Sequence, residues 1–212
     1  MAQSADARAA QLRMGEQLRE ARQKRRLSLR DLAERLGVSA SLISQIETGR
    51  ANPSVSTLYA LVAELDVSLD ELLFADRRGS AALSAARPDA ALVEGQLQRR
   101  EARTAIRLAS GVTWERLTPT SEPGTEFLYL TYDVGGASSV DGFQRHSGHE
   151  WGYVLDGTLD VRIGFDDFVL RSGDAISFDS TTPHRLSNSG TTPVRAIWFV
   201  SGRTVTDGRT GD

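Results

Sequence analysis

Residues 32–58, "LAERLGVSASLISQIETGRANPSVSTL", decide the fold of the first part of the chain. Their apolar residues recur at helical spacing and are separated by residues that favour helix ends. Ser28 with Asp31 forms a capping-box pattern that begins a helix, and Gly37 ends the same helix. Together with the flanking segments, this tract predicts five short helices, over residues 14–26, 29–36, 40–47, 54–65 and 69–74. A tight turn at residues 37–39 joins the second helix to the third.

The helix predicted over residues 40–47 has two different faces. Leu42, Ile43 and Ile46 lie on one side, as expected for packing into a core. The other side holds small or polar residues, namely Ala40, Ser41, Ser44, Gln45 and Thr48. Serine is only a middling helix former, so propensity does not explain this face. Small side chains let a helix enter the major groove, where a glutamine can pair with adenine through two hydrogen bonds. A solvated bundle face is the simpler alternative for one such helix, but the whole tract favours DNA recognition.

The tract resembles the helix-turn-helix of the phage-repressor and Cro-like (XRE) transcription factors over about residues 14–74, and residues 32–58 match without a gap. The resemblance implies a recognition helix at residues 40–47 and a dimer that reads a two-fold operator in double-stranded DNA. It places four residues on the base-facing side: Ala40, Ser41, Ser44 and Gln45. It places four others on the edge that contacts phosphates: Arg30, Thr48, Arg50 and Asn52.

Glu47 follows the recognition face but carries the wrong charge for DNA. A carboxylate that faced phosphate would be repelled, so we expect Glu47 to form an internal ion pair with an arginine of the first helix. Several basic residues end that helix: Arg22, Lys24, Arg25 and Arg26. They either attract DNA at long range or complement the helix dipole, and the sequence leaves both interpretations open.

Bulk composition limits the function classes without selecting one. The chain has 212 residues, a formal net charge of −3 and no cysteine, which excludes disulfides, thiolate zinc sites and thiol nucleophiles. It has no run of about 18 apolar residues and no apolar segment typical of a secretory signal at its start. We therefore expect a cytoplasmic protein with no membrane partner. Because the net charge does not attract nucleic acid, DNA binding must come from a local surface.

The second half of the chain has a different period. From about Phe127 onward, short runs rich in β-branched and aromatic residues, such as "EFLYLTYDV" and "VRAIWFV", alternate with turn residues, as in an all-β sandwich or barrel. We predict a two-domain fold, with an all-α, five-helix DNA-binding domain at residues 11–75 and an all-β domain at residues 104–202. We predict disorder at residues 1–10 and 203–212, and a flexible Ala/Arg-rich linker at residues 76–103, with a marginal helix as the alternative.

The chain uses histidine only three times, and two of these residues, His146 and His149, lie three positions apart beside Glu150. The third, His184, follows two further strand-like runs. Two imidazoles and a carboxylate with open positions suit non-haem Fe(II), and also zinc with a bound water. Spacing by itself favours the alternative of structural histidines that form hydrogen bonds near turns.

The surroundings of these histidines resemble the two motifs of the cupin β-barrel, a jelly-roll-like fold. The matching stretches are "HSGHEWGYVLDGTLDVRIG", residues 146–164, and "LRSGDAISFDSTTPHRLSN", residues 170–188. The resemblance implies that His146, Glu150 and His184 are the metal ligands and that His149 lies outside the set. Gln144 stands where the cupin motif has its first histidine, so it becomes a weaker fourth ligand that supplies oxygen. The implied cofactor is a divalent metal, with iron, zinc, manganese and nickel as candidates.

Three hypotheses follow from the two resemblances. The favoured one is a transcriptional regulator, not an enzyme, whose cupin domain binds a small-molecule effector or metal and modulates operator binding by a homodimer. The alternative is a non-haem iron enzyme of the epoxidase or oxygenase type, in which a cupin also follows a helix-turn-helix-like domain. An enzyme has no need of a groove-reading helix, and this favours the regulator. A third hypothesis is a regulator whose cupin is empty and serves only for dimerisation.

Overall fold

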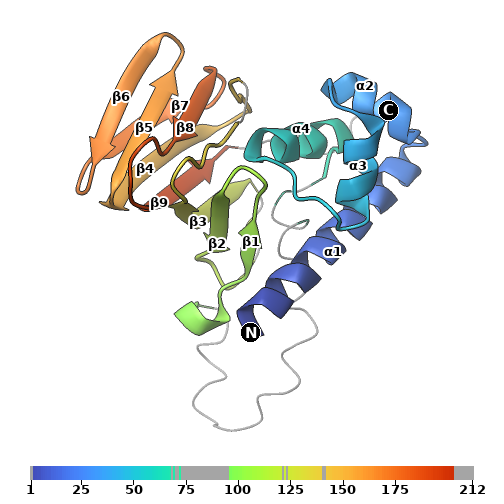
Figure 1. Ribbon diagram of the computed structural model, residues 1–212, viewed down its shortest axis with the longest axis horizontal. Coiled ribbons are helices and arrows are strands. Elements are labelled where there is room, and N and C mark those ends of the chain that lie inside the picture. Colours follow the sequence, from blue (N-terminus) through green and yellow to red (C-terminus); the bar gives the residue numbers. More distant parts are fainter. Residues whose placement is uncertain are drawn as a thin grey trace, which may run out of the picture.

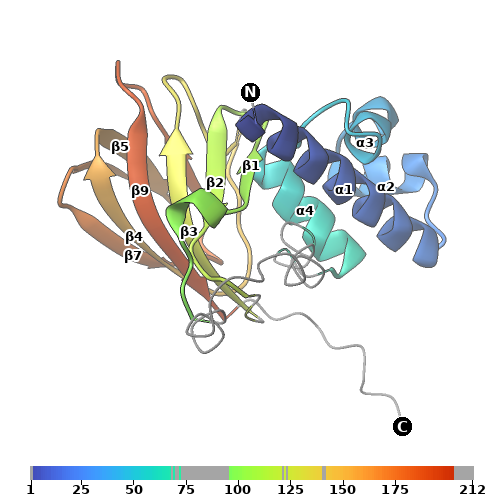
Figure 2. The same ribbon diagram turned by 90° about the horizontal axis from the view of Figure 1, so that it is seen from below.

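The computed structural model describes residues 2–67, 69, 72, 96–120, 122, 124–139 and 142–202. Figures 1 and 2 show a group of helices packed beside a β-sandwich, with the chain passing from the first to the second. The described residues contain four α-helices: α1 (Ala2–Lys24), α2 (Leu29–Leu36), α3 (Ala40–Glu47) and α4 (Val55–Leu65). None of the described helices is long and apolar enough to cross a membrane.

The ends of these helices follow the local signals of the sequence. Ser28 accepts a hydrogen bond from the Asp31 amide at 3.1 Å, and the Asp31 carboxylate accepts one from the Ser28 amide at 2.8 Å, so the predicted capping box is present. Gly37 ends α2 in the left-handed conformation, with φ of 66°. Ser39 and Ser54 cap α3 and α4 through their hydroxyls. The sequence therefore determines the boundaries of α2, α3 and α4 locally.

The predictions for the helical domain need two corrections. The described residues contain four helices where the sequence predicted five; of the range 69–74, only Leu69 and Leu72 are described, and both are buried. Disorder was predicted for residues 1–10, whereas the structure has α1 beginning at Ala2. Ala10 and Met14 are both buried at a four-residue spacing, so the apolar stripe of α1 starts earlier than predicted, and alanine is the strongest helix former. Residues 76–95 of the predicted linker and the tail at 203–212 lie outside the described residues.

The orientation of α3, the helix predicted to read DNA, is set by a close crossing and an ion pair with α1. A Cβ atom on Gly15 would lie 2.5 Å from the carbonyl oxygen of Ile46, so only glycine lets the two helices approach this closely. Arg22 donates from Nε and Nη2 to the two carboxylate oxygens of Glu47, at 2.6 and 2.8 Å, and donates from Nη1 to the Leu27 carbonyl. The predicted pairing of Glu47 with an arginine of the first helix is thus confirmed. Both side chains are nearly inaccessible to solvent, at 11% and 5% exposed.

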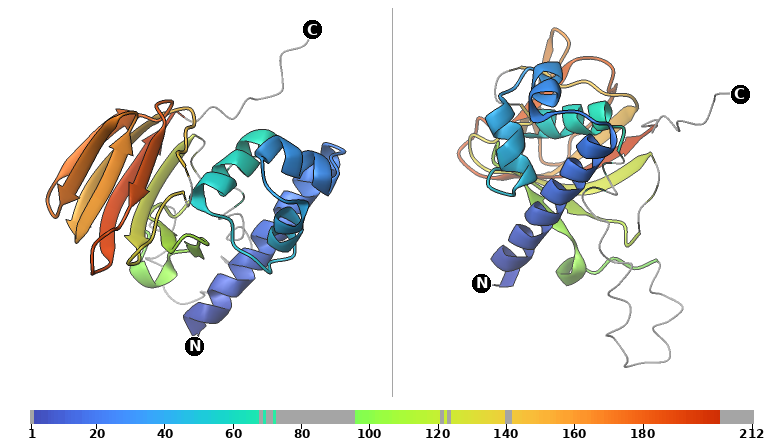
Figure 3. Two further views of the ribbon diagram at one scale, coloured as in Figure 1. Left: turned by 45° about the horizontal axis from the view of Figure 1, so that its top comes forward. Right: turned by 90° about the vertical axis from the view of Figure 1, so that its right-hand side faces the viewer.

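The second half forms two antiparallel sheets that face each other. The strands are β1 (Ala105–Arg107), β2 (Val112–Arg116), β3 (Thr125–Tyr132), β4 (His149–Asp156), β5 (Thr158–Ile163), β6 (Asp166–Arg171), β7 (Ala175–Asp179), β8 (His184–Ser187) and β9 (Val194–Ser201), preceded by a 3₁₀ turn (Arg100–Ala102). The larger sheet has the order β1-β2-β3-β9-β4-β7, and the smaller one has the order β6-β5-β8. Figure 3 shows these sheets stacked on the side of the molecule away from α2 and α3. The prediction of an all-α domain followed by an all-β, cupin-like domain is confirmed.

The interior of the sandwich comes from the alternating residues of its strands. On β2 and β4, buried and more accessible positions alternate, so every second side chain points inward. Gly152 of β4 is one of the inward positions, and a Cβ atom there would lie 2.0 Å from the ring of Trp198 on β9. The missing side chain leaves room for the Trp198 indole, whose Nε1 reaches the Glu150 carboxylate on the same strand as Gly152.

The helical domain packs directly on the β domain through α1, which lies beside β1, and through α4 (Figure 2). The Ser56 amide donates to the Ser138 carbonyl at 3.0 Å, and the Ala109 amide donates to the Pro53 carbonyl at 3.0 Å. Buried apolar residues of both halves form one continuous core. The two domains are therefore joined by a packed interface as well as by the chain.

Breaking the Arg22–Glu47 pair should destabilise the helical domain strongly. Arg22→Met leaves a buried carboxylate without its partner, and we expect the free energy of unfolding to fall by about 3 kcal/mol or more. Urea denaturation followed by helical circular dichroism measures the change. Arg35→Met is the matched control, because its ion pair with Glu64 is largely exposed on the arginine side and should be worth less than about 1 kcal/mol. Equal losses in the two variants would contradict the structural role of the buried pair.

Candidate functional site

Three predicted ligands converge between the two sheets. Glu150 points inward from β4, His184 opens β8, and His146 lies in the segment before β4. The His146 amide donates to the Ser180 carbonyl at 3.0 Å, while Gln144 and His184 exchange two backbone hydrogen bonds of 2.9 Å. These backbone contacts hold segments that are about forty residues apart in the sequence side by side, which places their side chains in one cluster.

The ligand atoms are close enough to share one ion. Oε1 of Glu150 lies 2.9 Å from Nε2 of His146 and 3.1 Å from Nε2 of His184, and the three ligand atoms lie within 4.8 Å of one another. Two ligands bound at about 2.1 Å and at right angles to each other are about 3 Å apart. The geometry of the cluster therefore fits a single divalent ion.

Hydrogen bonds at the back of each ligand select the atom that faces the cluster. Nδ1 of His184 lies 2.9 Å from the Thr182 carbonyl, and Nδ1 of His146 lies 3.1 Å from the Ser147 carbonyl. A carbonyl can only accept, so Nδ1 carries the proton in both neutral rings and Nε2 keeps its lone pair. Trp198 donates from Nε1 to Oε2 of Glu150 at 2.6 Å, which leaves Oε1 for the ion.

Glu150 is kept ionised although it is only 3% exposed. Burial by itself raises the pKa of this carboxyl. In the cluster without an ion, hydrogen bonds from His146 and His184, which need a proton on Nε2, and secondly the positive charge of those protonated rings outweigh burial and hold the pKa well below its usual range. Burial, and secondly the negative charge of Glu150, raise the pKa of Tyr132, so its hydroxyl stays protonated. A buried carboxylate and two neutral imidazoles are a ligand set that zinc, iron, manganese and nickel all accept.

Several buried donor and acceptor atoms of this cluster lack a hydrogen bond of good geometry within the described part of the chain. They are Oε1 of Gln144, Nε2 of His146 and Oε1 of Glu150. Buried polar atoms normally have a partner, and an ion at the centre of the cluster supplies one for the imidazole and the carboxylate. Gln144 is 7% exposed, and its Nε2 lies 3.1 Å from Nε2 of His184. Rotating its amide by half a turn puts Oε1 in that place, where it could ligate the ion.

The structure also places residues near the cluster that sequence patterns did not indicate. The ring of Tyr59, from α4, lies 4.4 Å from that of His146, and the ring of Phe178 lies 4.9 Å from that of His184. Trp198 also belongs to this group, because its indole donates to Glu150. The absent side chain of Gly152, between Trp151 and Tyr153, is the one local hint of its position. His149 points to the outer face of the sheet, with its ring 4.5 Å from that of Trp151.

The residues expected to meet DNA lie on one end of the helical domain. Ile43, Ile46 and Glu47 are the buried residues of α3, so its other side remains accessible. Of the eight expected DNA contacts, the exposed ones are Arg30, Ser41, Gln45, Thr48 and Arg50, and the half-buried ones are Ala40, Ser44 and Asn52. Nε2 of Gln45 donates to Oγ of Ser41 at 3.3 Å, which holds the glutamine side chain along the helix.

The basic cluster at the end of α1 is partly used inside the protein. Arg22 is committed to Glu47, and Arg25 lies 3.0 Å from the carboxylate of Asp66. Lys24 and Arg26 are exposed. Two members of the cluster therefore form ion pairs inside the helical domain, and only the other two add positive charge to its surface.

Comparison with known proteins gives the same two-part division. Residues 18–72 match the helix-turn-helix family HTH_3, and residues 128–200 match the cupin domain family. The HTH-type transcriptional regulator PuuR of Escherichia coli is 27% identical over 185 residues, which cover 86% of this chain and 91% of PuuR. The HTH-type transcriptional regulator DdrOP3 of Deinococcus deserti is 39% identical over 62 residues, 29% of this chain and 48% of that protein.

A solved structure has the same arrangement of domains. The crystal structure of an HTH_3 family transcriptional regulator from Vibrio cholerae matches with a TM-score of 0.63 at 21% identity, over 93% of this chain and 99% of that one. The protein is thus of the class in which a helix-turn-helix domain is followed by a cupin domain. The chain contains an XRE-type (HTH_3) helix-turn-helix domain and a C-terminal cupin domain, and it is homologous to the transcriptional regulator PuuR.

Metal binding at the cluster can be measured directly with Co²⁺, whose visible absorption reports its ligands. We expect one Co²⁺ per chain and an affinity at least about tenfold weaker in His184→Ala, because a side chain that binds the ion directly matters at least as much as the residues that support it. Gln144→His should strengthen binding by replacing an amide with an imidazole. His149→Ala is the matched control and should bind as the wild type does. A similar loss in His149→Ala and His184→Ala would contradict the assigned ligand set.

Proposed function

We propose that this regulator binds a two-fold operator as a homodimer, and that a divalent metal at His146, Glu150 and His184, alone or with a small-molecule effector, changes its operator affinity. The observation that carries the proposal is that one chain combines an accessible polar face of α3 with a buried ligand cluster beside α4 of the same domain. A bound ligand need only favour one of two arrangements, and couplings of about 1–3 kcal/mol are usual.

In this proposal the accessible face of α3 lies in the major groove. Gln45 and Ser41 meet base edges, and the small side chains of Ala40 and Ser44 let the helix come close. Phosphates are contacted by the flanking residues Arg30, Thr48, Arg50 and Asn52. The buried Arg22–Glu47 pair supports this arrangement, because it turns the one carboxylate of α3 away from the DNA.

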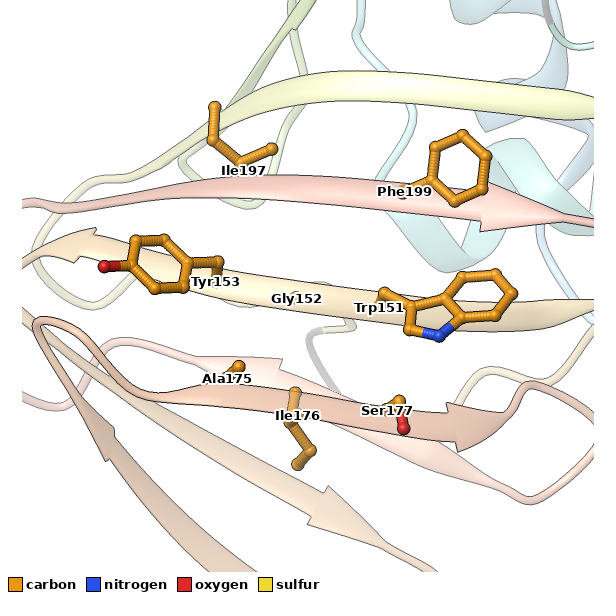
Figure 4. Close-up of a pocket in the computed structure, with 8 residues that line it drawn as sticks. All are labelled: Trp151, Gly152, Tyr153, Ala175, Ile176, Ser177, Ile197 and Phe199. Carbon is orange, nitrogen blue, oxygen red and sulfur yellow. The ribbon is translucent and has the colours of Figure 1, made fainter.

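The dimer would form through the outer face of the larger sheet. Phe127, Phe199 and Trp151 lie on the neighbouring strands β3, β9 and β4, with ring centroids 6.1 and 5.5 Å apart, and Tyr153 continues the row on β4. Figure 4 shows Trp151, Tyr153 and Phe199 around a pocket of about 420 Å³. Trp151 is 43% exposed and Tyr153 is 46% exposed. Such a contiguous aromatic patch marks an interaction surface, and a two-fold operator requires a second copy.

The central experiment selects genomic DNA fragments with the purified protein and then measures operator affinity with Co²⁺ and with a chelator. We expect a specific operator whose affinity depends on Co²⁺ in the wild type but not in a His146→Ala/His184→Ala double variant. The absence of any selected sequence would overturn DNA recognition. If operator affinity is the same with and without Co²⁺ and is unchanged in the double variant, the cupin domain serves only for dimerisation. Iron-dependent oxygen consumption with a phosphonate or small acid would instead favour the oxygenase alternative.

Two substitutions separate base reading from phosphate binding. Gln45→Ala should relax the preference for one base position and weaken operator binding by about 1–3 kcal/mol. Arg50→Ala should weaken binding to all sequences alike and lower the salt dependence by about one phosphate contact. Fluorescence anisotropy on the selected operator and on a scrambled duplex measures both effects. The assignment of roles fails if Arg50→Ala changes base preference while Gln45→Ala does not.

The oligomeric state depends on the aromatic face in this proposal. Trp151→Arg puts a charge in the centre of the face, and sedimentation velocity should then show a monomer at concentrations at which the wild type is a dimer. Phe165→Arg is the matched control, because Phe165 is fully exposed in the turn between β5 and β6 and lies outside the aromatic face. A dimer that survives Trp151→Arg would place the interface elsewhere.

A further inference from the structure

One side chain of the helical domain forms part of the wall of the metal site. Tyr59 is 6% exposed, and its ring lies 4.4 Å from the imidazole of His146, at an angle of 38°. On the barrel side the same ring lies 5.6 Å from the indole of Trp114. The hydroxyl of Tyr59 donates to Oε2 of Glu126 at 3.2 Å. The barrel therefore holds this tyrosine from several directions, although it belongs to α4.

Helix α4 also contacts the helices that present the DNA-reading face. Leu58 and Leu61 of α4 are buried in the core of the helical domain. Glu64, near its other end, forms an ion pair of 2.6 Å with Arg35 of α2, the helix that precedes the recognition helix. A displacement of Tyr59 therefore reaches α2 through α4, and it reaches α3 through α2, which packs on α3.

His146 is the ligand with the least regular support. Glu150 and His184 belong to strands, whereas His146 lies in the segment between residue 142 and β4. Its described ring contacts are to the carbonyl of the next residue, to Glu150, to His184 and to Tyr59. An ion bound at Nε2 fixes the direction of this ring, and a close-packed neighbour must follow because protein interiors have little free space.

We infer that Tyr59 is a positioning residue of the metal site and that it transmits the ring orientation of His146 to α4, and thereby to the recognition helix. The inference rests on the proposed metal binding at the cluster. It identifies the contact between the imidazole and the phenol ring, and not the chain connection between the domains, as the physical link. The ring contact is the essential part, and the hydroxyl of Tyr59 serves to anchor it to Glu126.

The test follows backbone amide exchange in residues 55–65 of the full-length protein, with and without saturating Co²⁺. We expect Co²⁺ to slow exchange in α4 of the wild type by about threefold or more, because it fixes His146 and so the ring that packs on it. Tyr59→Met keeps an apolar side chain of adaptable shape but loses the flat ring, so it should bind Co²⁺ and lose the response in α4. Tyr59→Phe is the matched control, since it keeps the ring and should keep the response.

The outcomes separate this inference from the proposed function. Unchanged exchange of wild-type α4 on Co²⁺ binding overturns the inference, and so does a Tyr59→Met protein that responds as the wild type does. If α4 responds but operator affinity does not depend on Co²⁺, the proposed function is wrong and the inference stands. If the wild type binds no Co²⁺, the proposed metal site is wrong and the inference falls with it. The wild-type measurement decides these cases even if Tyr59→Met fails to fold.

Discussion

The buried carboxylate of Glu150 is the constraint on which the interior of the β domain depends. An anion that is only 3% exposed needs partners on every side. Two imidazoles approach one of its oxygens, and the Trp198 indole donates to the other. Trp198 reaches it only because Gly152 has no side chain to block the ring. Strand register and the position of a glycine are both consistent with this one charge.

The helical domain uses a buried charge for a different purpose. Arg22 and Glu47 form a two-pronged ion pair inside the domain, so the carboxylate of α3 is neutralised and points away from solvent. Such pairs contribute less to stability than to choosing one arrangement, because desolvation offsets much of their attraction. In both domains, a buried ionic contact fixes which face of a helix or strand points inward and which face remains accessible to solvent. Tyr59 lies between the two, with its backbone in one domain and its ring against a ligand of the other.

Sequence patterns predicted the parts of the molecule that depend on neighbours along the chain. The capping box at Ser28 and the left-handed Gly37 are local features, and α2 begins and ends where they place it. The pairing of Glu47 followed from charge alone, since a carboxylate on a DNA-reading helix needs an internal partner. The start of α1 was missed, because alanine-rich segments carry no strong start signal and Ala10 is buried only by tertiary packing.

The sequence by itself determined the two domains, the helix-turn-helix, the β fold and the residue types of the candidate ligands, because periodicity, caps and motif spacing are written along the chain. Motif spacing also grouped His146 and His184 with Glu150 and left His149 outside. Only the tertiary structure showed which other residues meet this group: it brought Trp198 of β9 to Glu150 and Tyr59 of α4 against His146. The physical reason is that such contacts join positions tens of residues apart through strand pairing and domain packing. No local spacing in a sequence encodes them.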